Sequence, residues 1–400
     1  MSKLASLRGP GAAVLALAFL VLFVGGGGRH AIGLVLNPMA EALIWDRTFV
    51  GVLIAVFMVT TSLTMVAVGR LADRGSPVWI LVAGMAISAA GVGGMAVVET
   101  PWQALLCYGV VFAVGNGAVS ITPVGVMLTR QFGGRAGLAN SIAIAGMGLG
   151  QLAILSGLSV VMAEAGWRQV FLWLAVINLA AAPILLLGLN RRRTAAPPPD
   201  ATAASIVGDG LVAAARTRRF WILLGAYAIC GLQDFFVSAH VVAFALDQGI
   251  GPLFAGNLLA FMGLAGLVGV LLTGLWSDRA GPAWPTAACF ALRLAIFGLI
   301  LATDAPAAIA VFAMAYGVTY WVTAPLTVLF VRDLFGARNL GMLSGVVTMT
   351  HHIAGGLGAL AGARLFDRDG DYGAAFLLMA VCSIGGAALA LALHRHRRLS

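Results

Sequence analysis

The stretch GRLADR (residues 69–74) follows one long apolar run of this chain, and the stretch GLWSDR (residues 274–279) follows another in its second half. Both have the form Gly-x-x-x-Asp-Arg. A motif that recurs at corresponding places between hydrophobic stretches is typical of membrane proteins whose two halves are structural repeats. The pair therefore predicts two related helical bundles in one chain.

The composition also indicates a membrane protein. Of 400 residues, 61% are hydrophobic and 10% are charged, whereas a soluble domain has about 25% charged residues. The net charge is +9, but the basic residues lie in short loops between apolar runs, so no nucleic-acid partner is expected. The cysteines lie within apolar runs without CxxC spacing, so neither a disulfide framework nor a zinc site is expected. They are Cys107, Cys230, Cys289 and Cys382.

A membrane-spanning helix needs about 20 mostly apolar residues, and twelve segments meet that requirement. They lie at 11–36, 48–69, 78–98, 101–127, 138–163, 168–189, 220–246, 254–275, 283–303, 306–331, 340–363 and 373–394. The predicted fold class is an all-α membrane protein with twelve transmembrane helices in two pseudo-symmetric six-helix bundles. We expect one bundle at 1–190, a polar cytoplasmic linker at 191–219 and the second bundle at 220–400.

Lysine and arginine are concentrated on one side of these spans, and that side is expected to be cytoplasmic because basic loops are retained there. Both termini and the linker fall on it. The apolar run from residue 11 is long enough to span, so we expect it to remain as a helix and not to be cleaved as a signal. The expected location is the cell inner (cytoplasmic) membrane, where the chain is a multi-pass monomer in the lipid bilayer.

These features resemble the major facilitator superfamily of secondary transporters. Both Gly-x-x-x-Asp-Arg loops lie where that superfamily carries its signature, and the layout of six helices, a cytoplasmic linker and six helices is similar. The first copy departs from the full pattern, which continues x-Gly-Arg-Arg, because Ser76, Pro77 and Val78 stand there.

Three further stretches resemble the bacterial branch near the monocarboxylate transporters and the oxalate:formate antiporters. They lie at 29–38, 230–240 and 334–341. The resemblance implies an alternating-access carrier of a small organic anion, coupled to protons, without cofactor or enzyme activity. One departure is that the stretch 266–273 lacks the arginine with which related carriers bind a carboxylate. The alternative is therefore an exporter of amphipathic drugs or metabolites.

Two charged residues inside expected helices are candidates for function, because a charge near the middle of a bilayer costs at least about 2.5 kcal/mol unless it is paired or hydrated. Arg29 lies 40 residues before Gly69, and Asp234 lies 40 residues before Gly274, so the two are equivalent in the repeat. We expect Arg29 to bind the substrate anion through two parallel donors and Asp234 to take up a proton. The alternative is a permanent Arg29–Asp234 ion pair that locks the bundles.

Other polar side chains in the expected spans are candidates for the same cavity. Of His351 and His352, at least one is expected to bind the anion or accept a proton, and helix packing is the alternative. Consecutive histidines do not converge on one ion, so no metal site is expected. Asn116 and Gln233 are expected to orient substrate. His240 is expected either to relay protons or to have a structural role.

Two further features inside the spans each allow a structural interpretation. Arg293 belongs to the segment 283–303, which is peripheral in the resembled fold, and we expect it to pair across a helix seam or to reach the membrane edge. The glycine run at 25–28 lets the first helix bend or unwind where substrate is held, or it lets a neighbouring helix pack closely.

The repeated loops are expected to control conformation. An aspartate near the N-terminus of a neighbouring helix is stabilised by the helix dipole, and an arginine bonds facing carbonyl or carboxylate groups. The expected gating residues are Asp73, Arg74, Asp278 and Arg279. Their expected partners are Arg130, Arg135, Arg332 and Arg338. Breaking these contacts is expected to open the cytoplasmic side, and the alternative is that the arginines only anchor the topology.

Overall fold

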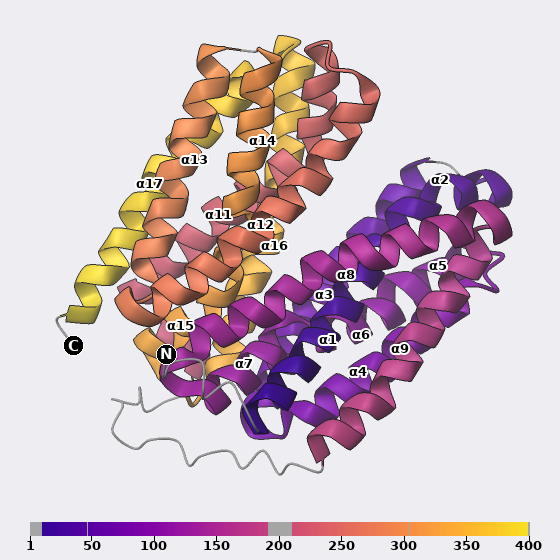
Figure 1. Ribbon diagram of the computed structural model, residues 1–400, viewed down its shortest axis with the longest axis horizontal. Coiled ribbons are helices and arrows are strands. Elements are labelled where there is room, and N and C mark those ends of the chain that lie inside the picture. Colours follow the sequence, from indigo (N-terminus) through magenta and orange to yellow (C-terminus); the bar gives the residue numbers. More distant parts are fainter. Residues whose placement is uncertain (1–9, 46, 191–209, 304, 399–400) are drawn as a thin grey trace. The chain divides into compact units, whose positions relative to one another are not determined.

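The computed structural model describes residues 10–45, 47–190, 210–303 and 305–398, and all regular structure among them is helical (Figure 1). Ten stretches of these residues are long and apolar enough to cross a membrane, and one of them, Pro101–Ala165, covers two of the expected spans. Leu340–Asp369 is a further helix of 30 residues, or about 45 Å at 1.5 Å per residue. The predicted all-helical membrane fold is confirmed.

The chain divides into two compact units: one is Met1–Asp200 with Asn339–Gly345, and the other is Ala201–Arg338 with Val346–Ser400. The first unit has α1 (Pro10–His30), α2 (Ile32–Leu43), α3 (Arg47–Arg74), α4 (Pro77–Met95), α5 (Pro101–Ala104), the π-helix η2 (Leu105–Phe112), α6 (Ala113–Ala118), α7 (Ile121–Phe132), the 3-10 turn η3 (Gly133–Arg135), α8 (Ala136–Ala165) and α9 (Trp167–Asn190).

The second unit has α10 (Gly210–Ala215), α11 (Arg218–Asp247), α12 (Pro252–Ala280), α13 (Ala283–Ala302), α14 (Pro306–Tyr320), α15 (Thr323–Phe335), α16 (Leu340–Asp369) and α17 (Gly373–Arg398). The first residues of α16 belong to the first unit. Helices α13 and α17 lie side by side, as do α12 and α14.

The fourth expected span of each half is broken at the same place. In the first unit α6 ends and α7 begins after Ser120, whose side chain accepts a hydrogen bond from the Thr122 backbone. In the second unit α14 ends at Tyr320 and α15 begins at Thr323. Pro123 and Pro325 each occupy the third position of the new helix, where the missing N–H group of proline costs no helical hydrogen bond. The repeat in the sequence is thus matched by a repeated helix break.

The first expected span is also divided, but not at its glycines. Residues 25–28 are helical within α1, and the break lies at Ala31, between α1 and α2. A Cβ atom added to Gly26 would lie 2.6 Å from the carbonyl oxygen of Met147 on α8. The glycine run therefore serves close packing of α1 against α8, the second of the two interpretations.

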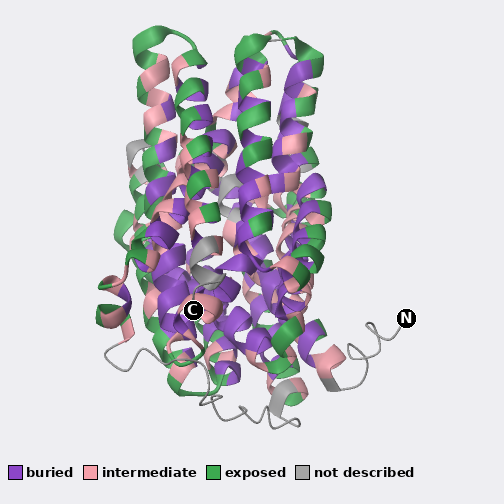
Figure 2. Ribbon diagram, turned by 90° about the vertical axis from the view of Figure 1, so that its left-hand side faces the viewer, coloured by how far each residue is buried: buried purple, intermediate pink, exposed green. Residues whose placement is uncertain are grey.

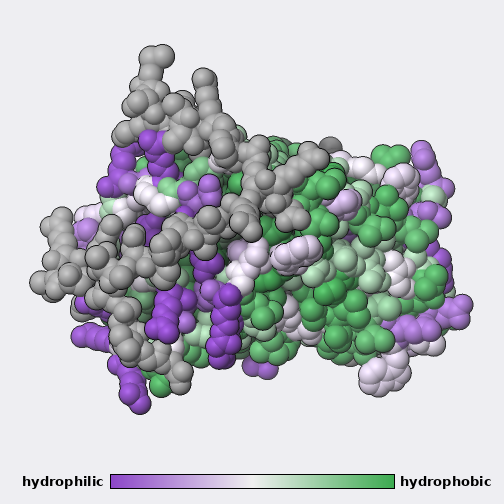
Figure 3. Space-filling view, turned by 90° about the horizontal axis from the view of Figure 1, so that it is seen from below, coloured by the Kyte–Doolittle hydropathy of each residue, from purple (hydrophilic) through white to green (hydrophobic). Residues whose placement is uncertain are grey.

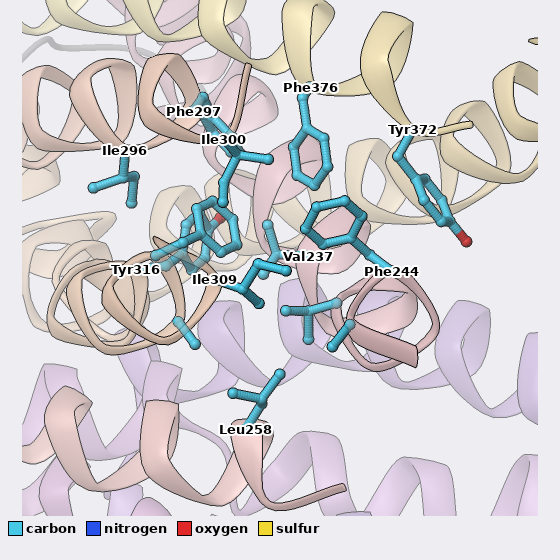
Figure 4. Close-up of a cluster of buried hydrophobic side chains, with 14 of the residues drawn as sticks. Val237, Phe244, Leu258, Ile296, Phe297, Ile300, Ile309, Tyr316, Tyr372 and Phe376 are labelled. Carbon is cyan, nitrogen blue, oxygen red and sulfur yellow. The ribbon is translucent and has the colours of Figure 1, made fainter. Parts of the chain in front are cut away.

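Each unit has its own apolar core. In the second unit aromatic rings from α11, α13, α14 and α17 meet, among them Phe244, Phe297, Tyr316 and Phe376 (Figure 4). Buried residues line the inward sides of the helices, and exposed ones their outward sides (Figure 2).

The outward sides are themselves largely hydrophobic. Large apolar side chains are exposed on most long helices, for example Leu179, which is 61% exposed. The face in Figure 3 has a broad hydrophobic area with hydrophilic side chains toward its ends. An exposed apolar surface of this extent is unfavourable in water, and a lipid bilayer supplies the apolar environment that it requires.

Candidate functional site

The second unit contains a buried ion pair. Arg293 of α13 is fully buried, and its Nη2 atom lies 2.6 Å from Oδ1 of Asp234 on α11. Of the two expectations for Arg293, pairing across a seam between helices matches this geometry, and reaching the membrane edge does not. An isolated charge in an apolar interior is very costly, and this pairing of opposite charges is the physical reason that Arg293 turns inward.

Arg293 makes five hydrogen bonds, as many as a guanidinium has N–H donors. Its Nε and Nη2 atoms donate to the hydroxyl and the carbonyl of Thr319, at 3.0 and 3.1 Å. Its Nη1 atom donates to Gln233 Oε1 at 3.2 Å and to Cys230 Sγ at 3.6 Å. The fifth bond is the one to Asp234. Arg293 thus acts as a fixed counter-charge inside the protein.

The two carboxylate oxygens of Asp234 have different surroundings. Oδ1 accepts from Arg293 and, at 2.9 Å, from the hydroxyl of Tyr316. Oδ2 accepts from the thiol of Cys230 and lies near Nε2 of His351 on α16, both at 3.3 Å. The side chain of Asp234 is 5% exposed and that of His351 is 18% exposed. One oxygen is therefore held by the buried network, while the other faces a more accessible titratable group.

Helix geometry explains why these groups meet. Cys230 and Asp234 are four residues apart on α11, so they lie on one face of that helix. Gly231 on the same helix has no side chain, and a Cβ atom there would collide with the backbone carbonyl of His351. The absence of that Cβ lets α16 approach α11 closely enough for the imidazole of His351 to reach Asp234.

Gln233, which we expected to orient substrate, is fully buried in this network. Its amide nitrogen donates to the carbonyl of Met379 at 2.9 Å and to the hydroxyl of Ser383 at 2.7 Å, both on α17. Its oxygen accepts from Arg293. Gln233 therefore joins α11 to α17 and positions Arg293.

The other histidines differ from His351 in their partners. His240 lies 3.2 Å from the Tyr372 hydroxyl through Nδ1 and 2.9 Å from the Ala359 carbonyl through Nε2, which matches its structural alternative. His352 points its Nδ1 at the carbonyl of Thr348, 2.8 Å away on its own helix. Of the two consecutive histidines, His351 is the one that reaches the buried carboxylate.

Arg29, the expected anion-binding residue, lies at the end of α1 in the first unit and is half-buried. Its Nη2 atom lies 3.9 Å from the thioether sulfur of Met58 on α3. The ion-pair partner that the structure gives to Asp234 within its own unit is Arg293.

Tyr108 of η2 is the neighbour of Arg29 that sequence reasoning missed. Its hydroxyl is buried, interacts electrostatically with Arg29 and has no hydrogen-bond partner among the described residues. The Tyr108 ring packs against Phe57 and Phe112, with centroids 4.9 and 5.2 Å away. The π-helical turn that carries Tyr108 is a feature often found at functional sites. Nothing in the sequence distinguishes this tyrosine from other residues of its apolar run.

Asn116 of α6 lies close to the glycine run of α1. Its amide nitrogen donates to the carbonyl of Gly25 at 3.4 Å, and the residue is 6% exposed. This bond fixes the backbone of α1 one turn before Arg29. Asn116 is therefore placed to position the helix that carries Arg29.

The first Gly-x-x-x-Asp-Arg loop contacts the beginning of α16 within the first unit. The backbone N–H groups of Gly341 and Met342 donate to the two carboxylate oxygens of Asp73, at 2.7 and 2.9 Å. Arg130 donates to the carbonyls of Ala72 and Asp73 and lies 3.6 Å from the Asp73 carboxylate. The carboxylate thus lies at a helix N-terminus, whose N–H groups favour its charged form, while its burial opposes that form.

The remaining expected gating residues are less enclosed. Arg74 and Arg279 are exposed at the ends of α3 and α12, and Asp278 is half-buried. Among their expected partners, Arg332 pairs with its neighbour Asp333 at 3.0 Å.

A family model described as the Major Facilitator Superfamily matches residues 18–359 and 223–399. The chain is 28% identical over 286 residues to monocarboxylate transporter 13 of Bos taurus. The aligned region covers 70% of this chain and 65% of the length of that relative. It is 24% identical to the uncharacterized MFS-type transporter YcxA of Bacillus subtilis (strain 168), covering 89% of this chain and 88% of that protein.

Two solved structures share the fold. One is the E. coli fucose:proton symporter FucP, with a TM-score of 0.74, 18% identity and coverage of 95% of this chain and 98% of that chain. The other is FucP in the outward conformation, with a TM-score of 0.78, 16% identity and the same coverage.

Proposed function

Because the chain belongs to the Major Facilitator Superfamily of secondary transporters, we propose that it carries a small monocarboxylate-like anion together with protons by alternating access. Its family and fold are those of transporters and not of enzymes, and it is a multi-pass membrane protein with a small-molecule substrate. The proposal further places both termini on the cytoplasmic side of the inner membrane and takes the monomer as the working unit.

One observation carries the proton coupling: the buried carboxylate of Asp234 has Oδ1 held by Arg293 and Tyr316, while Oδ2 faces His351. Histidine titrates near neutral pH. A proton taken up by His351 creates an imidazolium 3.3 Å from that oxygen, where the opposite charge stabilises it. His351 is thus the residue that first takes up the proton. Asp234 either accepts the proton from His351 or stabilises it there by its negative charge.

The substrate anion is assigned to Arg29 with the hydroxyl of Tyr108. A guanidinium offers a carboxylate two parallel donors, and a phenol O–H group supplies a third. The Tyr108 hydroxyl is buried without a hydrogen-bond partner among the described residues, which is unfavourable until a ligand accepts from it. Relatives named as monocarboxylate transporters support a carboxylate as the ligand.

The proposal predicts saturable uptake of labelled monocarboxylates by proteoliposomes, and faster uptake when the outside is made acidic. The panel includes lactate, pyruvate and acetate as well as dicarboxylates, and liposomes without protein are the control. An uptake rate that is the same with and without the acid gradient contradicts proton coupling. Folded protein that moves no acid contradicts the anion proposal and favours the exporter of amphipathic metabolites.

We propose that Asp73 acts as a gate through the hydrogen bonds that its carboxylate accepts from the first residues of α16. Replacing Asp73 with asparagine removes the charge and one of two acceptors, and a hydrogen bond to a charged group contributes about 1.5–3 kcal/mol. Amide hydrogen exchange at Gly341 and Met342 is expected to become roughly tenfold faster or more. Mass spectrometry of peptides covering 339–345 measures it. Arg70→Gln, at an exposed position of α3, is the control and is expected to leave the exchange unchanged. Equal rates in the wild type and Asp73→Asn contradict the gate.

A further inference from the structure

Three side chains beside the buried ion pair have the chemistry of metal ligands. They are the thiol of Cys230, the carboxylate of Asp234 and the imidazole of His351, and their ligand atoms all lie within 4.8 Å of one another. The sequence did not indicate this group, because the third member lies more than a hundred residues from the other two. We propose that these residues form a binding site for a borderline-soft divalent cation of the Zn²⁺ or Cd²⁺ type.

The distances fit such an ion. Cys230 Sγ and His351 Nε2 each lie 3.3 Å from Asp234 Oδ2. Bonds of about 2.0–2.3 Å from zinc to oxygen, nitrogen and sulfur place tetrahedral ligands about 3.4 Å apart. The ion therefore fits between the three atoms with small side-chain movements. The fourth coordination position is left for water on the side of His351, the member of the group with the most exposed side chain.

The charges also fit. Binding replaces the thiol proton of Cys230 with a bond from sulfur to the metal, and that proton leaves to solvent. The thiolate and the carboxylate then offset the two charges of the ion, while Arg293 stays on the other oxygen of Asp234 and lies 3.6 Å from the sulfur. The occupied site carries the same net charge as the metal-free site with His351 protonated. A bound ion therefore takes the place of the proton at Asp234 Oδ2.

The site is made of residues of the second unit, whereas the proposed substrate groups belong to the first, and its test does not depend on transport. Purified full-length protein in detergent is titrated with Cd²⁺, and binding is followed by the ultraviolet charge-transfer absorption of cadmium–thiolate bonds. One ion per chain is expected. Cys230→Ser is expected to abolish the absorption, and His351→Gln to weaken the affinity by at least roughly 100-fold.

Cys382→Ser is the matched control, because Cys382 is a partly buried thiol on α17 outside the group. This variant is expected to bind Cd²⁺ as the wild type does, and thermal unfolding checks that all three variants are folded. His351→Gln keeps the ion pair of Asp234 intact, so it tests the site even if Cys230→Ser fails to fold. A wild type without the absorption, an absorption that survives in Cys230→Ser, or an unchanged affinity in His351→Gln overturns the site.

Discussion

Replacing Arg293 with methionine is expected to lower the free energy of unfolding by about 3–5 kcal/mol, because the carboxylate of Asp234 is then buried without its counter-charge. The side chain of Arg293 is fully buried and joins α13 to α11 and α14. Thermal unfolding of the purified protein in detergent measures the loss.

A second substitution separates loss of charge balance from loss of packing. In the double variant Arg293→Met with Asp234→Asn no charge is left unpaired, and most of the stability is expected to return. Arg364→Met is the matched control, since Arg364 is exposed on α16, and its effect is expected within about 0.5 kcal/mol. A loss for Arg293→Met no larger than that of the control contradicts a structural role of the pair, as does a double variant no more stable than the single one.

Replacing Arg29 with alanine is expected to weaken binding of the transported anion by roughly 30-fold or more. The reason is that truncating one partner of a desolvated charge pair costs about 2–5 kcal/mol. Arg29→Lys keeps the charge but loses the parallel donors, so an intermediate affinity is expected. Calorimetric titration with the monocarboxylate that is transported best measures these affinities.

Two further variants show whether the effect belongs to the site. Tyr108→Phe removes only the buried hydroxyl and is expected to lower affinity by roughly tenfold without loss of stability. Arg168→Gln is the control in the same unit, because the Arg168 guanidinium is engaged by the Ala96 carbonyl and the Trp167 ring. If Arg29→Ala binds the anion as tightly as Arg168→Gln does, Arg29 is not the binding residue.

The helical fold could be predicted from the sequence because length and apolar composition decide whether a segment crosses a bilayer. The breaks within the expected spans could not be predicted, because they depend on the hydrogen bonds and packing of individual helical turns. The first span looked continuous, and its glycines suggested a bend within 25–28. The break is at Ala31, and the helix continues through the glycines, of which Gly26 and Gly27 pack against α8.

Asp234 could be predicted as a functional candidate, but Arg293 could not be placed by the same reasoning. The register of the repeat relates equivalent positions of the two halves, and it says nothing about which way α13 turns its side chains. Charge balance was the signal that could have found the pair. Asp234 is the only acidic residue within the twelve expected spans, so an arginine buried among the helices of the second half had one available counter-charge.

The neutrality of the Arg293–Asp234 pair has a consequence for how the membrane voltage acts on the protein. A voltage of 100 mV is equivalent to about 2.3 kcal/mol for each elementary charge that crosses the bilayer, and it acts on net charge alone. The Arg293–Asp234 pair has no net charge, so its movement in a rearrangement of the second unit transfers no net charge across the membrane. An anion and a proton that cross together also carry none. Under the proposed mechanism, the gradients of the acid and of pH set the direction of net movement, and the electrical potential does not.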